Sequence, residues 1–276
     1  MLFKDKSLYE LYCKDGYVVL SLFDENKLNA LKELYQKNTI AQEKGLLPSL
    51  RYRSSRDKIA EYNELAAIVD AALKKHFENF DYVANHFITK TANNPDEFKL
   101  HQDWNVTDES KFIAAHIWCP LQDTNEQNGG LFVVKGSHRF FNNYRSGSLG
   151  IPFITSTEKV KQHITSFKLK AGDAVVYNQA LFHGSHPNNT STDRKVVLSC
   201  IKPKDAPMLI YHKGSSDNAG TRIKAYNITP NMLLEQIAEL EKGVIPANAS
   251  LYSDFIVTAA LQQKEINNDN FEECLH

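Results

Sequence analysis

Short apolar runs separated by turn-forming residues are the feature that most restricts the fold of this chain. They occupy residues 81–199, and each run is bounded by Asn, Gly, Pro or Asp. Runs rich in β-branched and aromatic residues are typical of strands, and six or more at this spacing predict a barrel or a double sheet. The predicted strands are 82–89, 112–118, 130–134, 165–169, 174–177 and 196–201, with an earlier one at 16–23.

The segments on either side of these strands show apolar residues at helical spacing, so we expect helices that cover a sheet. The predicted helices are 7–13, 26 to about 44, 57–76, and one that begins after Thr229-Pro230 and ends at Lys242-Gly243. The expected organisation is one domain over residues 1–276. It comprises a helical N-terminal part of about 1–80, a core of about 81–205 and a helical C-terminal extension of about 225–270.

Composition restricts the partners. Hydrophobic residues make up 42% of the 276 residues, which is enough for a sizeable core, and 32 basic against 33 acidic side chains leave no bulk charge to hold a polyanion. No apolar stretch approaches the roughly 20 residues that span a bilayer, and the N-terminus lacks a secretory signal.

The four cysteines form no CxxC pair, so the sequence does not support a zinc knuckle or a disulfide scaffold. We expect a cytoplasmic monomer or homodimer that binds a small molecule, with no nucleic acid and no membrane as partner.

His101, Asp103 and His183 have the residue types of a metal site. Residues two apart on a strand point to the same side, so His101 and Asp103 can face the interior while Gln102 points away. His183 follows the apolar run 174–182 and would supply a third ligand from a distant strand. Two imidazoles and one carboxylate are the ligand set of non-haem Fe(II) oxygenases. The tripeptide alone is a weak signal, because a chain with ten histidines will contain it by chance.

Arg194 is a candidate anchor for an anionic ligand. An isolated arginine is more often a surface salt-bridge residue. The alternation of Arg194 with Val196 and Leu198 instead directs it into the barrel, where an unpaired guanidinium would be costly. A carboxylate ligand would compensate this cost, because the guanidinium is a planar, permanently charged fork.

Several motifs in a fixed order resemble the phytanoyl-CoA dioxygenase family, which includes ectoine hydroxylase and many bacterial relatives. The resemblance is close over residues 80–202 and looser at Asp15–Leu20. The motifs are Leu100-His-Gln-Asp-Trp104, Trp118-Cys-Pro-Leu-Gln-Asp123, Asn128-Gly-Gly-Leu-Phe-Val-Val-Lys-Gly-Ser-His-Arg139, and Phe182-His-Gly-Ser-His-Pro-Asn-Asn-Thr-Ser191 through Arg194. The resemblance implies a mainly β protein with flanking helices, whose core is a double-stranded β-helix (jelly-roll, cupin-like). It also implies the use of Fe(II), O2 and 2-oxoglutarate.

The resemblance also implies roles for single residues. The expected iron ligands are His101, Asp103 and His183, and the expected contacts of 2-oxoglutarate are Arg194 and Ser185 at its C5 carboxylate and Trp118 beside it. The implied reaction is hydroxylation of an unactivated C–H bond in a small metabolite, amino-acid-derived or a natural-product intermediate, with release of succinate and CO2. Halogenating relatives replace the carboxylate ligand with a small residue, so Asp103 favours hydroxylation.

Alternatives remain at several positions. His186 competes with His183 as the distal ligand, and the offsets to Ser185 and Arg194 favour His183. The candidate substrate contacts are Lys90, Trp104, His116 and His186, although a satisfied core histidine is an equal expectation for His116. His138 is expected to form structural hydrogen bonds rather than to bind metal. Two other functions fit the same triad: a Zn-dependent hydrolase, and a catalytically silent jelly-roll protein that binds a metal or a metabolite.

Overall fold

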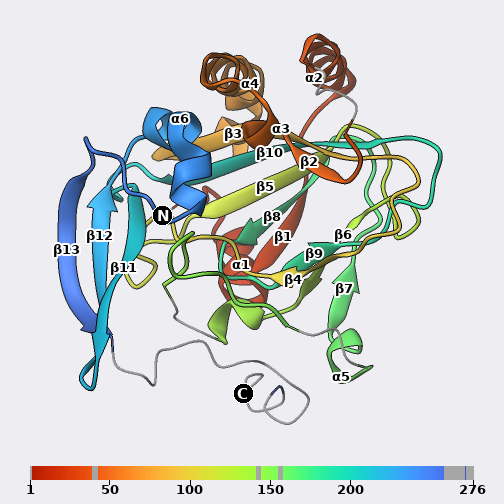
Figure 1. Cartoon of the computed structure of the whole chain (residues 1–276). Helices are drawn as coiled ribbons and strands as arrows, with labels where there is room; N and C mark the ends of the chain where they lie inside the picture. The colour runs from red at the N-terminus through yellow and green to blue at the C-terminus, as the bar shows by residue number, and fades with distance from the viewer. Residues whose placement is uncertain (1, 39–42, 141–143, 155–157, 258–270, 272–276) are drawn as a thin grey trace.

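Two antiparallel sheets face each other in the computed structural model, which describes residues 2–38, 43–140, 144–154, 158–257 and 271. The larger sheet has the order β1 (Tyr17–Ser21), β8 (Asp173–Asn178), β5 (Ala115–Pro120), β10 (Arg194–Pro203), β3 (Phe80–Lys90) and β2 (Leu46–Pro48). The smaller sheet has the order β4 (Phe98–His101), β9 (His183–Ser185), β6 (Leu131–Val134) and β7 (Ile164–Ser166). Figure 1 shows the two sheets on opposite sides of the core.

The inner faces of the two sheets share one apolar cluster. Val175, Val196 and Leu198 from the larger sheet pack in the same cluster as Leu131 and Val133 from the smaller sheet. Alternate residues of a strand point to opposite faces, so the same strands can bury a second set of side chains on their outer face. This arrangement confirms the expected mainly β fold with a jelly-roll core.

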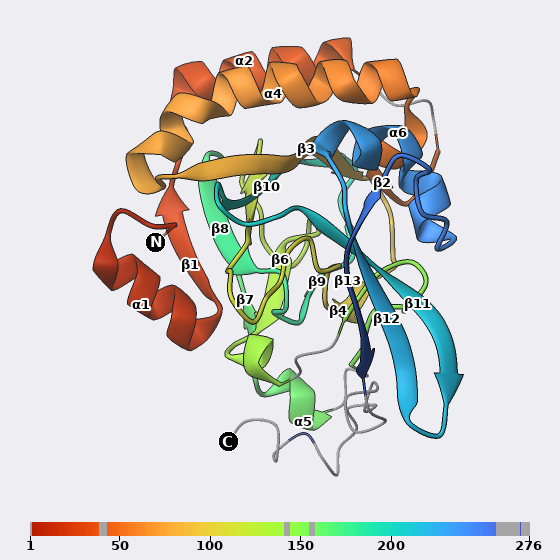
Figure 2. The same cartoon turned by 90° about the vertical axis from the view of Figure 1, so that its left-hand side faces the viewer.

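Helices cover the outer face of the larger sheet. The helices α2 (Glu25–Lys37) and α4 (Ser55–His76) lie side by side above β3 in both views (Figures 1 and 2). Leu31 and Leu65 of these helices are buried in one cluster with Phe87 and Val197 of the sheet. The remaining helices are α1 (Lys6–Asp15), α3 (Ser49–Tyr52), α5 (Glu158–Lys161), α6 (Pro230–Glu241) and a 3-10 turn, η1 (Ser137–Arg139).

Side chains at the predicted boundaries begin these helices. The Asp24 carboxylate accepts a hydrogen bond from the backbone N–H of Lys27, and the Ser54 hydroxyl accepts one from that of Asp57. Each bond satisfies an amide that has no partner inside the helix. The helix expected to run from 26 to about 44 already ends at Lys37, and residues 39–42 lie outside the described part of the chain. No helix among the described residues is both long and apolar enough to cross a membrane.

The expected helical extension at about 225–270 contains the predicted helix, α6, which is the one helix among the described residues of this range, but it also contains strand residues. A third antiparallel sheet is formed by β11 (Leu209–Asp217), β12 (Gly220–Asn227) and β13 (Ser250–Val257), and the end of β12 and all of β13 lie in the range expected to be helical. Buried Ile223 and Ala225 alternate with the more exposed Arg222 and Lys224 along β12. This period of two is a strand pattern, but its polar outer face makes the segment less apolar than the strands of the core. Residues 258–270 are outside the described residues.

The burial of α4 predicts a stability effect. Leu65→Ala removes a fully buried side chain from the layer between α4 and the larger sheet, so we expect the free energy of unfolding to fall by about 2 to 5 kcal/mol. Leu11→Ala on α1 is the matched control, because the Leu11 side chain is 48% exposed and its loss should change stability by less than about 0.5 kcal/mol. Urea denaturation followed by circular dichroism measures both. Equal effects of the two substitutions would contradict the assigned packing.

Candidate metal centre

The antiparallel pairing of β4 with β9 brings the two histidines together. His101 and His183 are direct partners in the register of these strands. The chain is tightly packed at this point, because a Cβ atom at Gly184 would collide with the carbonyl oxygen of Phe98. Glycine is therefore required beside His183. His183 begins β9 and does not end the preceding strand, since β8 stops at Asn178 and a turn separates the two.

Asp103 reaches the histidines from a loop. The strand β4 ends at His101, so the expectation that His101 and Asp103 share a strand face is wrong for Asp103. The backbone N–H of Asp103 donates to the carbonyl of Gln179 at 3.0 Å, which holds the loop against the turn before His183. Gln102 is fully buried, and its amide nitrogen donates to the carbonyl of Ala180. The turn that precedes His183 thus also positions the carboxylate.

Backbone carbonyls orient both imidazoles. His101 Nδ1 lies 2.9 Å from the carbonyl oxygen of Lys99, and His183 Nδ1 lies 2.9 Å from that of Leu181. A carbonyl oxygen can only accept, so each Nδ1 carries the proton and each Nε2 presents its lone pair. This is the arrangement that metal-binding histidines use to fix their tautomer.

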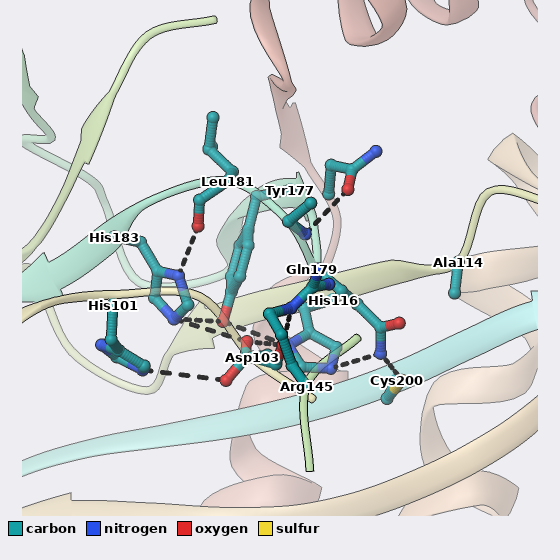
Figure 3. A network of polar contacts seen from close by, with 12 residues as sticks. His101, Asp103, Ala114, His116, Arg145, Tyr177, Gln179, Leu181, His183 and Cys200 are labelled. Atoms are coloured by element: carbon teal, nitrogen blue, oxygen red, sulfur yellow. Dashed lines mark hydrogen bonds and ion pairs between the residues drawn. The ribbon is translucent and has the colours of Figure 1, made fainter. Parts of the chain in front are cut away.

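The three side chains point toward one another (Figure 3), and their ligand atoms all lie within 4.8 Å of one another. Asp103 Oδ1 is 3.7 Å from His101 Nε2, and Asp103 Oδ2 is 3.4 Å from His183 Nε2. Burial lowers the pKa of His183 to about 4, so this imidazole is neutral at pH 7. Both imidazoles therefore direct Nε2 toward the Asp103 carboxylate, and a divalent cation fits this site.

His116 contacts the carboxylate from the side away from His101. Its Nδ1 lies 2.7 Å from Asp103 Oδ2, and its Nε2 lies 3.1 Å from the amide nitrogen of Gln179. Burial by itself would raise the pKa of Asp103, but His183 and His116 together hold it well below its usual range. The hydroxyl of Tyr177 lies 3.3 Å from His116 Nδ1 and 3.4 Å from His183 Nε2. His116 thus satisfies its own polar atoms and orients Asp103.

Arg194 lies in the same interior with part of its guanidinium unsatisfied. The residue is 2% exposed, and within the described part of the chain its Nε and Nη1 have no hydrogen-bond partner. Burial lowers its pKa to about 9. Its Cζ lies 5.3 Å from the ring centroid of Trp118. A buried guanidinium without an acceptor is costly, so the residue fits a bound carboxylate.

Lys90 adds a second positive group at this end. Its ammonium donates to Ser185 Oγ at 3.2 Å, and β3 places Lys90 opposite Arg194 in the sheet register. Burial, with Arg194 as the next cause, lowers the pKa of Lys90 to about 7. Two adjacent buried cations repel each other, and a bound dianion would relieve both. Arg194, Ser185 and Lys90 therefore lie together, and their positive charges and hydroxyl fit an anion.

One cavity of about 320 Å³ connects the three candidate ligands with Arg194. Trp104 and His116, two of the expected substrate contacts, lie on its wall, and Trp118 and Ser185 do as well. Lys90 and His186 are not lining residues. The His186 ring instead lies 2.8 Å from the Ser166 hydroxyl, and it does not join the cluster of ligand atoms. The structure therefore does not support Lys90 and His186 as substrate contacts.

Some residues of the site have no signal in the sequence. Tyr177 was expected only as the end of a strand, and Gln179 belonged to a run between strands. Tyr177 becomes a site residue because its hydroxyl, carried by β8, lies against His116 and His183, and Gln179 does so because the turn after β8 packs against Asp103. His138, expected to be structural, lies 2.9 Å from the carbonyl oxygen of Cys13 through its Nε2.

Comparisons with known proteins identify a matching family and a curated relative. Residues 12–196 match the family described as phytanoyl-CoA dioxygenase (PhyH). A curated relative, "Dioxygenase olcK" from Penicillium canescens, is 24% identical over 225 residues, which are 71% of this chain and 70% of that protein.

Two solved structures share the fold. The epimerase SnoN, in complex with Fe3+, alpha ketoglutarate and nogalamycin RO, has a TM-score of 0.53 at 17% identity, covering 73% of this chain and 86% of its own. EvdO2 from Micromonospora carbonacea var. aurantiaca, complexed with 2-oxoglutarate, has a TM-score of 0.50 at 16% identity, covering 72% and 91%. At this identity the likeness extends to the fold alone.

The geometry predicts which histidine binds metal. His183→Ala removes one of three converging ligand atoms, so we expect Fe(II) affinity to fall by more than about a hundredfold. His186→Ala, in the same strand region but outside the ligand cluster, should leave the affinity within about twofold. Anaerobic equilibrium dialysis with Fe(II) measures both. A larger loss for His186→Ala than for His183→Ala would show that the distal ligand is misassigned.

Proposed function

The chain belongs to the phytanoyl-CoA dioxygenase family, and we propose that it hydroxylates an unactivated C–H bond of a small metabolite. It is an Fe(II)- and 2-oxoglutarate-dependent dioxygenase, as the family and the cluster of two histidines and one aspartate require. In this reaction R–H, O2 and 2-oxoglutarate become R–OH, succinate and CO2. Iron held by these three side chains would activate O2, which is the oxidant of this conversion, and 2-oxoglutarate would supply two of the four electrons.

The protein contributes binding and orientation. We assign the iron to His101, Asp103 and His183, whose acceptor atoms converge. The 2-oxoglutarate would lie between the iron and Arg194, with Trp118 beside it and Ser185 at its distal carboxylate. His116 keeps the Asp103 carboxylate turned toward the two histidines through its 2.7 Å contact. These contacts position the reactants before the chemical step, which is how a fixed site lowers the barrier.

The observation that carries the proposal is the buried, partly unsatisfied guanidinium of Arg194 in the same cavity as the three ligand atoms. A Zn-dependent hydrolase would need the triad but has no use for this cation. A catalytically silent protein that binds only a metabolite would have no need for the three converging ligand atoms, and one that binds only a metal would have no need for the buried guanidinium. A dicarboxylate that bridges the metal and Arg194 accounts for both features.

Spectroscopy tests this assignment directly. Anaerobic addition of Fe(II) and then 2-oxoglutarate should produce a visible charge-transfer absorption band, because the keto oxygen and a carboxylate oxygen of 2-oxoglutarate would bind the iron. Admission of O2 should then release succinate. A folded protein that shows no band but hydrolyses ester or amide probes in the presence of Zn(II) would instead support the hydrolase.

Substitutions at the two ends of the site should have different effects. Asp103→Ala should abolish Fe(II) binding and succinate release, because a ligand is lost. Arg194→Ala should retain Fe(II) but raise the KM for 2-oxoglutarate roughly ten- to a hundredfold, since one charge-assisted pair is removed. The control is Arg222→Ala, which removes an exposed arginine that pairs with Asp254 on the third sheet. Loss of Fe(II) from both Asp103→Ala and Arg194→Ala would contradict the separate roles.

The pH dependence of 2-oxoglutarate binding tests the contribution of Lys90. In the free protein its pKa is lowered to about 7, and a bound dianion would favour the charged form and raise that pKa. The affinity for 2-oxoglutarate is therefore greatest below the pKa that Lys90 has in the free protein, and it decreases as the pH rises through this pKa. We expect this affinity to weaken by up to about tenfold from pH 6 to pH 8 at saturating metal. The Lys90→Met variant should bind 2-oxoglutarate more weakly at pH 6, and its affinity should not change with pH in this range. The same change of affinity with pH in the variant and in the unsubstituted protein would exclude Lys90 as the cause.

A further inference from the structure

The cavity extends well beyond the space between the metal ligands and Arg194. Along the inner face of β10, Arg194 is opposite Lys90, Leu198 is opposite Trp118, and Cys200 is opposite His116. Cys200 follows Arg194 by six positions, which corresponds to about 20 Å along the strand. His116 contacts Asp103, so the metal ligands lie near the Cys200 end of this row. The part of the cavity on that side is free for the prime substrate.

Apolar side chains line this second end. Val83 and Ala84 come from β3, and Trp104 follows the ligand Asp103 directly. Leu233 and Ile237 of α6 form the opposite wall. Trp104 and Leu233 are only half-buried because they border the cavity. An apolar surface that remains open inside a pocket is typical of a ligand-binding site.

The helix α6 lies outside the residues that match the family. The family match ends at residue 196, whereas α6 spans Pro230–Glu241. Met232 and Leu240 anchor it in a buried cluster with Cys200 of β10, and Trp104 and Leu233 pack against that cluster. Part of the wall at this end of the cavity is thus built by residues outside the family match.

The charges on this wall are already paired. Outside the metal ligands and Arg194, the aspartate, glutamate, lysine and arginine residues among the described lining residues are Arg51 and Glu241. Arg51 Nε lies 2.6 Å from Glu241 Oε1, so the two neutralise each other at the junction of α3 and α6. An ionised substrate would lose its hydration here without gaining a counter-ion, which is unfavourable.

We propose that the prime substrate is an uncharged, largely apolar molecule, and that Trp104, Leu233 and Ile237 determine this preference. The proposal rests on the proposed function and specifies its substrate class. The wall favours an apolar natural-product skeleton over a free amino acid, whose ammonium and carboxylate would both lack partners. Hydroxylation converts one C–H bond of this skeleton to C–OH, with O2 and 2-oxoglutarate consumed and succinate and CO2 released.

Tryptophan fluorescence tests the proposal without turnover. The chain has two tryptophans, Trp104 and Trp118, and both line the cavity. The protein is saturated with Ni(II) and 2-oxoglutarate, so that the Trp118 end is filled before a probe is added. Three probes share the bornane skeleton and differ in charge: borneol is neutral, bornylamine is a cation and ketopinate is an anion. We expect borneol to give a saturable response and the two ions to bind at least about tenfold more weakly.

A substitution in α6 should reverse this preference. Leu233→Asp places a carboxylate on the wall, so we expect borneol to bind at least about tenfold more weakly and bornylamine to become the preferred probe. Ala238→Asp adds the same charge on the exposed face of the same helix, away from the cavity, and should leave the order of the probes unchanged. Circular dichroism and the Fe(II)–2-oxoglutarate absorption band establish that both variants are folded.

The outcomes separate the substrate class from the reaction. The substrate proposal is overturned if an ionic probe binds as tightly as borneol, if borneol gives no saturable response, or if Ala238→Asp changes the preference as much as Leu233→Asp. The proposed function survives each of these results if the anaerobic absorption band forms in the same preparation. A saturable borneol response in a protein that never forms the band would refute the dioxygenase and retain the apolar site.

Discussion

The pairing of β4 with β9 is the interaction on which the site depends. It places His101 directly opposite His183, and the backbone carbonyls of Lys99 and Leu181 turn both Nε2 atoms inward. The turn before β9 also holds the loop that carries Asp103, through the carbonyl of Gln179. A shift of one residue in this pairing would move the histidines to opposite faces of the sheet. The jelly-roll core supplies the rigid frame that keeps the register.

Burial of charge explains why the rest of the cavity is arranged as it is. Asp103 and Arg194 are ionisable groups that share the interior with apolar side chains such as Trp118, Leu131 and Leu198. Such groups are tolerated where a partner compensates them. For Asp103 the partners are His116 and, when bound, the metal, and for Arg194 a dicarboxylate completes the set. The remaining wall has its one exposed arginine already paired with Glu241, and therefore favours a neutral ligand.

Much of the core could be predicted, because its strands are both apolar and bounded by turn residues. The runs that became β3, β5, β6, β8 and β10 were all recognisable, and so were α2 and α4 with their capping residues. The bounds of β4 and β9 were not predicted, since Phe98-Lys-Leu-His101 and His183-Gly-Ser185 are not apolar runs. The third sheet was not predicted, and the expected helical extension covered the end of β12 and all of β13. The strand β12 is apolar on one face only, and its burial depends on packing against Tyr211 and Val257.

The residues themselves determined the chemistry of this protein. Two histidines, one aspartate and a buried arginine at these positions specify a metal ligand set and an anion anchor, because only these side chains offer the required lone pairs and the planar charged fork. Only the tertiary structure decided which groups surround them. It placed His116 against Asp103 and Lys90 beside Ser185, and it brought α6 to the wall of the cavity. Such contacts join segments far apart in the chain, so no local spacing encodes them. The proposed preference for a neutral substrate follows from the apolar lining and the paired charges of Arg51 and Glu241.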